Sequence, residues 1–582
     1  MIEENIKIKH REKKFFLNEL FKVKILWMIF IFISILESIS FLGIPYLIKL
    51  TIDSLIKNTM PLELIKIVML MILLNCLQFI LKVIREYIHV KLLLKVEKNI
   101  KNELFNKTLK LPISFFKKYN EGDIFTIINN DVGVVQDFIA TILPMSIYNL
   151  LMIFGITTLL FYLSVRLTLL VVSIYIFVLI LNRLYSEKIK VFHQNQQIMR
   201  SKYNTFFYDS ISKVKTIQLF NYKKYIKEIF LENITKLQEK IIKSNMATIT
   251  SGAIVGWLIF TGTIMIFGYG GYLYLNDLIT IGGIVAFSSY YARLNEPISF
   301  IKNIHFSLQR SKVSYKRISK ILYQHSVETN NNFSIDQFES LEFKDVNFIY
   351  KDNICLFKNL NFTIDKNENV AIVGKNGDGK STIIDIISGF YTVSKGQVLI
   401  NGYNIFDMNI DLWRDKIGIV PQKSIFFKNT IIENIRLNNE NYKIEDVIKV
   451  CKTVGMHEYI NSLPNKYYTN LIDNANNLSG GQRQRLSIAR VLLRNPEVII
   501  FDEMSTGLDA LASSQLTNII SNVSSNRTCI YITHDLREIK KFDKIIVLNN
   551  GLIESFGNHS SLVNVSETYQ TLYNHSMQKE GV

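Results

Sequence analysis

The first half of the chain contains long apolar runs, and the second half contains none of comparable length. The runs span residues 25–48, 65–84, 138–181, 248–273 and 279–301. A helix needs about 20 apolar residues to cross the hydrocarbon core of a bilayer. The run 138–181 is long enough for two such helices, and Ser164-Val165-Arg166 is its clearest interruption. The pattern therefore predicts six membrane-spanning helices in the first half.

Two long charged segments connect these predicted spans, one between spans two and three and one between spans four and five. Both have few glycines and prolines, so they are compatible with continuous helix. Because a helix rises about 1.5 Å per residue, such segments would extend well beyond the lipid headgroups and return. We expect them to meet another component in the cytoplasm.

Composition supports a membrane protein. The chain is 48% hydrophobic and 12% aromatic, which is rare for a soluble enzyme of 582 residues and excludes intrinsic disorder. Its net charge of +17 could indicate nucleic-acid binding or cytoplasmic loops beside anionic lipid. The cations decide between these two, because they gather before the first span, at Lys7, Lys9, Arg11, Lys13, Lys14, Lys22 and Lys24.

That distribution predicts a cytoplasmic N-terminus, and six spans return the chain to the cytoplasm, so the C-terminus is cytoplasmic too. Arg166, in a predicted outer loop, is an exception. Nucleic acid is then not needed as a partner.

The first apolar run is too long for a secretory signal, and four dispersed cysteines fit a reducing compartment. The bias toward Asn, Ile and Lys favours a bacterial inner membrane.

The second half has the pattern of an α/β domain. A polar, Asn-rich segment at 323–338 is the predicted linker, which leaves a transmembrane domain at 1–322 and a second domain at 339–582. Short apolar runs in the second domain are typical of buried parallel strands. These runs are residues 370–373, 417–420, 498–501 and 529–532.

A glycine-rich phosphate-binding motif follows the first of these strands. It fits the pattern G-x-x-x-x-G-K-[ST], and a helical run beginning at Thr382 follows it. Backbone N–H groups and the positive helix end would hold phosphate; Lys380 would reach the β- and γ-phosphates and Ser381 would bind Mg²⁺. The predicted nucleotide-binding residues here are Gly374, Lys375, Asn376, Gly377, Asp378, Gly379, Lys380, Ser381 and Thr382.

A pair of carboxylates ends the third strand. Asp502 and Glu503 follow the apolar residues 498–501. In the presence of a phosphate loop, Asp502 is expected to hold Mg²⁺ through water, and Glu503 to polarise the water that attacks the γ-phosphate. The alternative interpretation is that the two acidic residues lie in a solvated turn, and it does not account for the phosphate loop.

A second anion site precedes another helix. Leu478-Ser479-Gly480-Gly481-Gln482 reads LSGGQ, and one domain needs two phosphate sites only if a second copy supplies one of them. With this motif the chain resembles the ATP-binding cassette (ABC) transporters over nearly its whole length. The resemblance implies an ABC-type P-loop domain, and it places Ser479, Gly480, Gly481 and Gln482 against ATP held by a partner chain.

The resemblance assigns further residues. Tyr350 is similar to the aromatic residue that stacks on adenine, and Gln422 to the Q-loop glutamine that senses Mg²⁺ and takes part in catalysis. Residues 505–509 resemble the D-loop, which includes Asp509, and His534 resembles the histidine that grips the γ-phosphate. The resemblance implies Glu503, His534, Gln422 and Lys380 as catalytic residues, and Ser381, Gln422 and Asp502 as Mg²⁺ ligands.

The membrane half resembles one branch of the family, the type IV exporters. Residues 111–116, 122–123 and 130–132 are similar to the first intracellular loop, whose coupling helix docks on a nucleotide-binding domain. Residues 208–220 are the candidate for the second coupling helix. One membrane domain fused to one cassette implies a half-transporter, and intact motifs favour a homodimer.

Two segments depart from the family pattern. Asp378 stands where a small residue is usual. A carboxylate near the triphosphate lowers nucleotide affinity unless it points away or is paired, and we expect it to point outward. Residues 472–475 replace the usual Gly-Glu-x-Gly stretch before the signature, which puts coupling through that stretch in doubt.

The resemblance implies an ATP-driven exporter that works by alternating access on two ATP, with a cargo such as a peptide, a lipid or an amphipathic drug. Alternatives are an importer on the same fold and an ATP-gated channel or sensor. Glu37 within span one could favour cationic cargo, or it could serve only as a helix–helix contact, with Arg293 and Glu296 pairing in span six.

Overall fold

The computed structural model describes residues 14–57, 61–119, 121–324, 333–350, 355–472, 475–504, 510–524, 527–533 and 542–578. These residues form two compact units, each considered by itself. The first unit contains the described residues up to Asn106 together with Gly122–Tyr323. The second contains Lys107–Glu121 and the described residues from Gln324 onward.

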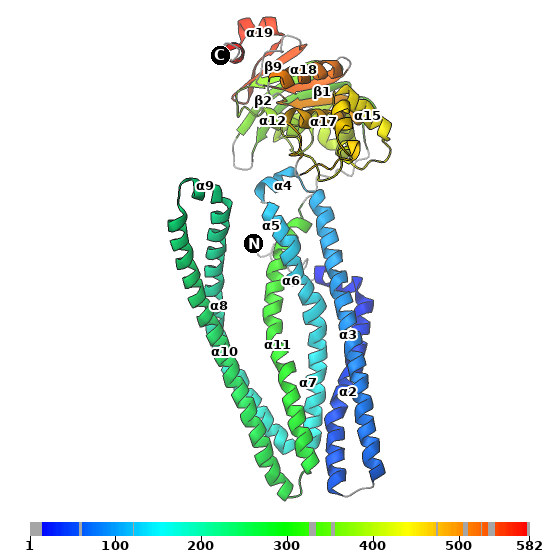
Figure 1. Ribbon diagram of the computed structural model, residues 1–582, viewed down its shortest axis with the longest axis vertical. Helices are drawn as coiled ribbons and strands as arrows, with labels where there is room; N and C mark the ends of the chain where they lie inside the picture. The colour runs from blue at the N-terminus through cyan, green and yellow to red at the C-terminus, as the bar shows by residue number, and fades with distance from the viewer. Residues whose placement is uncertain are drawn as a thin grey trace. The chain divides into compact units, whose positions relative to one another are not determined.

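The first unit is entirely helical (Figure 1). Residues 14–22 are helical, and the third long helical run includes two π-helical turns, η1 and η2. The elements are α2 (Lys24–Ile56), α3 (Pro61–Leu109), α5 (Glu121–Thr126), η1 (Ile127–Asp131), α6 (Val132–Asp137), η2 (Phe138–Ile142), α7 (Leu143–Leu163), α8 (Val165–Ser212), α9 (Val214–Leu219), α10 (Lys223–Leu275) and α11 (Ile281–Leu322).

Five helical runs among the described residues are long and apolar enough to cross a membrane. They are α2, α3, the run from Gly122 to Leu163, α8 and α10. The sixth predicted span lies in α11, where Arg293 and Glu296 interrupt the apolar stretch. α11 nevertheless buries Phe287, Tyr290 and Tyr291 against the other helices, so its apolar surface faces protein.

Side-chain caps set two helix boundaries in this unit. Ser164 ends the helical run at the predicted interruption, and its hydroxyl accepts the Leu167 N–H at 3.4 Å at the start of α8. Thr280 caps α11 in the same way. Asp53 of α2 accepts bonds from the Thr280 hydroxyl at 2.9 Å and the Gly282 N–H at 3.1 Å, which joins α2 to the start of α11.

The long extensions predicted between the spans are present as helix. α3 has 49 residues, α8 has 48 and α10 has 53, each far more than the roughly 20 residues that a bilayer requires. α8 and α10 run side by side, and the short helix α9 joins them at the tip of this pair (Figure 1).

Glu37 is not free within the bundle. It is 3% exposed, and its carboxylate pairs with Arg85 of α3 at 3.1 Å. Arg85 also pairs with Glu86 at 2.9 Å and lies over the Tyr148 ring at 4.5 Å. Arg293 donates to the Phe41 carbonyl at 2.7 Å and lies over the Phe41 ring, a different arrangement from the predicted pair with Glu296. The helix–helix interpretation of Glu37 fits these contacts.

The second unit contains two sheets. An antiparallel sheet has the order β2-β1-β4-β5, and a six-stranded sheet has the order β10-β9-β3-β8-β7-β6. In the larger sheet β10 is antiparallel to β9, and the other neighbours are parallel. The strands are β1 (Ser340–Ile349), β2 (Cys355–Asp365), β3 (Asn369–Gly374), β4 (Lys395–Ile400), β5 (Tyr403–Asn404), β6 (Ile417–Val420), β7 (Val498–Asp502), β8 (Thr528–Ile532), β9 (Lys544–Asn549) and β10 (Leu552–Gly557).

The four strands predicted from apolar runs are therefore confirmed as β3, β6, β7 and β8. Most of their residues are buried, because helices cover the parallel sheet. The helical elements of this unit are α4 (Ile113–Lys118), α12 (Lys380–Ile387), η3 (Ile405–Asp407), α13 (Ile410–Lys416), α14 (Ile431–Arg436), α15 (Ile444–Thr453), α16 (His457–Ser462), η4 (Lys466–Tyr468), α17 (Gly480–Leu493), α18 (Ala510–Ser524), α19 (His559–Val565) and α20 (Glu567–Gln578).

Candidate nucleotide site

The predicted chemical groups follow the carboxyl ends of adjacent parallel strands. The phosphate loop follows β3, Gln422 follows β6, and Glu503 follows β7. Because β3, β8, β7 and β6 are neighbours in that order, these residues meet at one edge of the sheet. Ligands of open α/β sheets bind at this edge, since the loops that leave the strands converge there.

The phosphate loop, residues 374–381, leads from β3 into α12. Gly377 and Gly379 have φ angles of 97° and 92°, a left-handed region that favours glycine. Lys380 is 5% exposed, and its ammonium donates to the carbonyl oxygens of Gly374 and Lys375, both at 2.9 Å. Burial lowers the pKa of Lys380, and the carboxylates of Glu503, Asp378 and Asp502 act against that shift.

The prediction that Asp378 points outward is wrong. Its side chain is 7% exposed, and the carboxylate turns back onto the loop. One oxygen accepts the Lys375 N–H at 2.7 Å, and the other accepts the Asn550 N–H at 3.3 Å. Two backbone donors therefore compensate the carboxylate for lost water, as a buried charge requires.

Glu503 and Gln422 are in direct contact. The Gln422 Nε2 donates to the Glu503 Oε2 at 2.6 Å, and the Glu503 N–H donates to the Ile532 carbonyl at 2.9 Å. Glu503 has φ of 46°, a left-handed conformation that is unfavourable for a residue with a side chain. Such backbone strain is maintained by the surrounding structure and is concentrated at functional sites.

Tyr350 lies beside the start of α12. Its hydroxyl shares a hydrogen bond with the Thr382 hydroxyl at 2.9 Å, and its ring packs edge-on against Phe348 and Tyr391. The structure thus brings the predicted adenine-stacking residue next to the predicted phosphate-binding helix, although the two are distant in the sequence.

The LSGGQ segment forms the N-terminus of α17. The Ser479 hydroxyl accepts the Gln482 N–H at 3.2 Å, and the Gln482 side chain accepts the Ser479 N–H at 2.9 Å. This is a reciprocal capping box. Ser479 is exposed, and the residues after it pack into a different hydrophobic cluster from that of α12. The cap presents an exposed helix N-terminus, where an anion is favoured.

Comparison with known proteins identifies the chain. The family model described as the ABC transporter transmembrane region matches residues 27–298, and the ABC transporter model matches residues 357–506. A Staphylococcus aureus protein (strain bovine RF122 / ET3-1), named provisionally as a multidrug export ATP-binding/permease protein, is 30% identical over 542 residues, which are 91% of this chain and 94% of that protein. The chain belongs to the ABC transporter family.

Other matches agree with this assignment. The counterpart in Staphylococcus aureus strain NCTC 8325 / PS 47 is also 30% identical over 91% of this chain and 94% of its own length. A solved structure of a bacterial Atm1-family ABC exporter with ATP bound shares the fold with a TM-score of 0.80 at 20% identity, over 96% of this chain and 98% of that one. This ABC transporter is an integral membrane protein and an ATPase whose hydrolysis of ATP is coupled to transport.

The site's oxygen atoms fit Mg²⁺, a cation that prefers hard oxygen ligands. Burial raises the pKa of Asp502 to about 6, with further contributions from the carboxylates of Glu503 and Asp385, while Lys380 opposes the shift. A divalent cation would relieve this crowding of negative charge. Asp502, the Ser381 hydroxyl and the Gln422 amide oxygen would hold the ion, which would neutralise phosphate charge in ABC hydrolysis.

Some predicted site residues lie outside the described part of the chain. These are His534 and the D-loop residues 505–509, which include Asp509, together with 473–474 of the altered segment before the signature. Sequence reasoning also missed residues that contact the site. Asn550 bonds to Asp378, and Asp385 lies near Asp502. The Asn550-Gly551 pair was a detectable signal, because Asn-Gly is typical of tight hairpin turns.

Two glycines of the ABC phosphate loop offer a matched test. A Cβ on Gly379 would lie 2.6 Å from the Phe357 ring, whereas a Cβ on Gly377 would have nothing within 4 Å. Both backbones are left-handed, so Ala strains both, and only Gly379→Ala also overpacks the core. We expect Gly379→Ala to be about 1–3 kcal/mol less stable than Gly377→Ala. Thermal unfolding of the full chain with and without ATP measures this; equal stability of the two variants would contradict the packing argument.

Proposed function

We propose that this chain is a half-transporter that assembles as a homodimer and exports its cargo by alternating access. The observation that carries the proposal is the exposed LSGGQ cap at α17, whose hydrogen bonds stay within its own helix start while the phosphate loop packs on a separate cluster. Each chain has one LSGGQ segment and one phosphate loop. Two chains arranged head-to-tail would complete two ATP sites by a two-fold axis.

In each composite site the residues would act together. Tyr350 would stack on adenine, and the loop with Lys380, Ser381 and Thr382 would bind phosphate. Asp502, Ser381 and Gln422 would hold Mg²⁺, and Glu503 would activate water with His534 on the γ-phosphate. The partner chain would contribute Ser479, Gly480, Gly481 and Gln482 across the interface, with Asp509 from the D-loop nearby.

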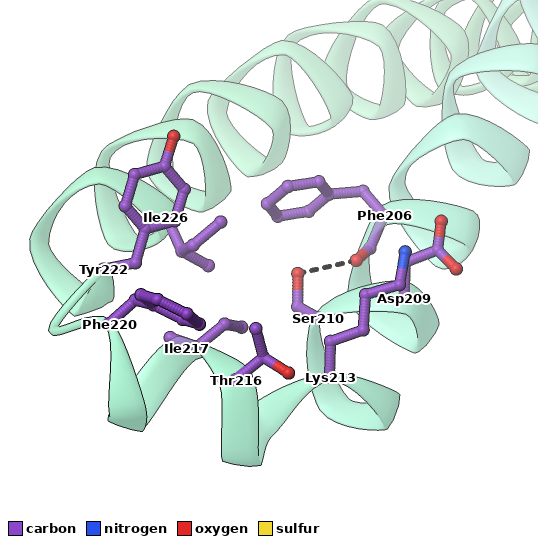
Figure 2. Close-up of a pocket in the computed structure, with 9 residues that line it drawn as sticks. All are labelled: Phe206, Asp209, Ser210, Lys213, Thr216, Ile217, Phe220, Tyr222 and Ile226. Carbon is purple, nitrogen blue, oxygen red and sulfur yellow. Dashed lines mark hydrogen bonds between the residues drawn. The ribbon is translucent and has the colours of Figure 1, made fainter.

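Two segments support mechanical coupling. α4 groups with the cassette unit although it lies within the membrane half of the sequence, and Leu111 and Phe115 beside and within it are buried. At the tip of α8 and α10, side chains from both helices and from α9 surround a mostly apolar hollow of about 440 Å³ (Figure 2). We propose that the partner's cassette fills this hollow, since Phe220, which lines it, is 77% exposed.

The cargo class follows from the relatives and from the bundle. The Staphylococcus aureus relatives are named for multidrug export, and a peptide, a lipid or an amphipathic drug fits such a transporter. The Glu37 carboxylate is paired with Arg85, so it offers no free negative charge to a cationic cargo.

We place the chain in a bacterial inner membrane with both termini cytoplasmic, because the basic residues flank the cytoplasmic ends of the predicted spans.

Mixed dimers test the composite site. One preparation pairs a Lys380→Ala chain with a Ser479→Arg chain, which puts both defects in one site and leaves the other site intact. The second pairs a Lys380→Ala/Ser479→Arg chain with a wild-type chain, which damages both sites. With two purification tags, we expect the first dimer to retain roughly half of the wild-type nucleotide occlusion and the second almost none.

The two preparations carry the same substitutions, so they control for folding and expression. The reverse order, almost no occlusion in the first dimer and about half in the second, would mean that one chain supplies both halves of a site. Direction is tested separately in vesicles with outward-facing cassettes: ATP-driven dye accumulation supports export, and ATP-driven dye loss supports import. Dye flux down its gradient in a Glu503→Gln chain with ATP would instead support a channel.

A further inference from the structure

The Asp378 carboxylate joins two parts of the cassette unit that are far apart in the sequence. It binds the Lys375 N–H inside the phosphate loop at 2.7 Å and the Asn550 N–H outside it at 3.3 Å. Gly374 makes room for this arrangement, since a Cβ there would lie 2.9 Å from the carboxylate. A small residue at position 378 could not reach the second donor.

Asn550 belongs to a tight turn. β9 and β10 pair up to Asn549 and Leu552, so Asn550 and Gly551 form a two-residue turn, with φ of 49° and 76°. A Cβ on Gly551 would lie 1.8 Å from the Leu356 carbonyl oxygen, which shows how closely the turn lies on β2. The turn is therefore packed against β2 and gives the loop a partner outside itself.

Glu554 connects the other side of this turn to the C-terminal helix. Its carboxylate accepts the Asn549 amide at 2.9 Å and the Ser566 hydroxyl at 2.6 Å, and also bonds to Thr568. The Ser566 oxygen in turn accepts the Tyr569 N–H at 3.0 Å, which caps α20. Burial raises the pKa of Glu554, but the hydrogen bonds from Ser566, Thr568 and Asn549 outweigh it and hold the pKa below its usual value.

We propose that Asp378 is a positioning residue that fastens the phosphate loop to the β9–β10 turn, and that Glu554 extends this connection to the start of α20. A loop held with its N–H groups already oriented loses less entropy when it binds phosphate, which offsets the repulsion between a carboxylate and the triphosphate. ATP affinity would then depend on the C-terminal helix. This inference rests on the proposed role of the loop in binding ATP.

Hydrogen exchange of the nucleotide-free full chain tests the connection itself. We expect the Lys375 and Asn550 amides to exchange at least tenfold faster in Asp378→Ala than in wild type, because a charged hydrogen bond contributes about that factor or more. Glu445→Ala, which removes an exposed carboxylate of the same unit, is the control. Unchanged exchange at both amides in Asp378→Ala would overturn the proposal, whether or not the chain hydrolyses ATP.

The dependence on α20 is tested with Glu554→Ala, which lies on the far side of the turn from the loop. We expect it to raise KM for MgATP about threefold to tenfold with little change in kcat. The same change in an Asp378→Ala background should have no further effect, because the connection is already cut. Glu567→Ala, an exposed carboxylate in the first turn of α20, should leave KM unchanged.

Either of two results would overturn the connection to α20: a wild-type KM in Glu554→Ala, or an equal rise in KM with and without Asp378. A fall in KM in Asp378→Ala with no effect of Glu554→Ala would show that Asp378 acts only as a repelling charge. If the wild-type chain hydrolyses no ATP, the proposed function fails, and the exchange rates still decide the connection.

Discussion

Replacing Glu503 with glutamine is expected to lower MgATP turnover about a hundredfold to ten-thousandfold while ATP still binds. Glu503 follows β7 and accepts a hydrogen bond from the Gln422 amide at 2.6 Å. Glutamine keeps the size of the side chain and one acceptor oxygen, so the contact with Gln422 can persist. What is lost is the carboxylate that would take a proton from the attacking water.

Phosphate release by the purified chain in liposomes, together with equilibrium ATP binding, measures both quantities. Glu445→Gln, which neutralises an exposed carboxylate of α15, should keep wild-type turnover. Undiminished turnover in Glu503→Gln would remove Glu503 from the water-activating role. Loss of ATP binding in that variant would instead assign Glu503 to nucleotide binding.

Replacing Arg85 with methionine is expected to destabilise the membrane unit by about 3–5 kcal/mol, because it leaves the Glu37 carboxylate buried without its partner. Glu37 and Arg85 are 3% and 6% exposed, on α2 and α3. The change also removes the contact between Arg85 and the Tyr148 ring at 4.5 Å. Thermal unfolding of the chain in detergent provides the measurement.

The double variant Glu37→Leu/Arg85→Met should recover most of that stability, since it leaves no unpaired buried charge. Lys66→Met, which removes an exposed cation of the same helix α3, controls for the loss of one positive charge. If the double variant is stable and keeps cargo-stimulated ATPase activity, the pair is a helix–helix contact. A stable double variant that loses cargo stimulation would return Glu37 and Arg85 to the cargo path.

Several features of this transporter were determined locally and so could be predicted from the sequence. Apolar runs gave the long helices and the strands β3, β6, β7 and β8, because burial in lipid or in a covered sheet requires continuous apolar residues. The spacing of glycines before Lys380 and Ser381 predicted a phosphate loop, since only a few backbone shapes direct N–H groups at phosphate. The break at Ser164 was visible because capping is a property of adjacent residues.

Contacts between distant segments were decided only by the tertiary structure. Asp378 was predicted to point outward, and its actual partner Asn550 lies 172 positions away. The pairing of Glu37 with Arg85 and the connection from Glu554 to α20 have no local signal either. A charged side chain in a low-dielectric interior must find a compensating partner, and the fold, not the neighbouring residues, determines which donor or ion lies within reach.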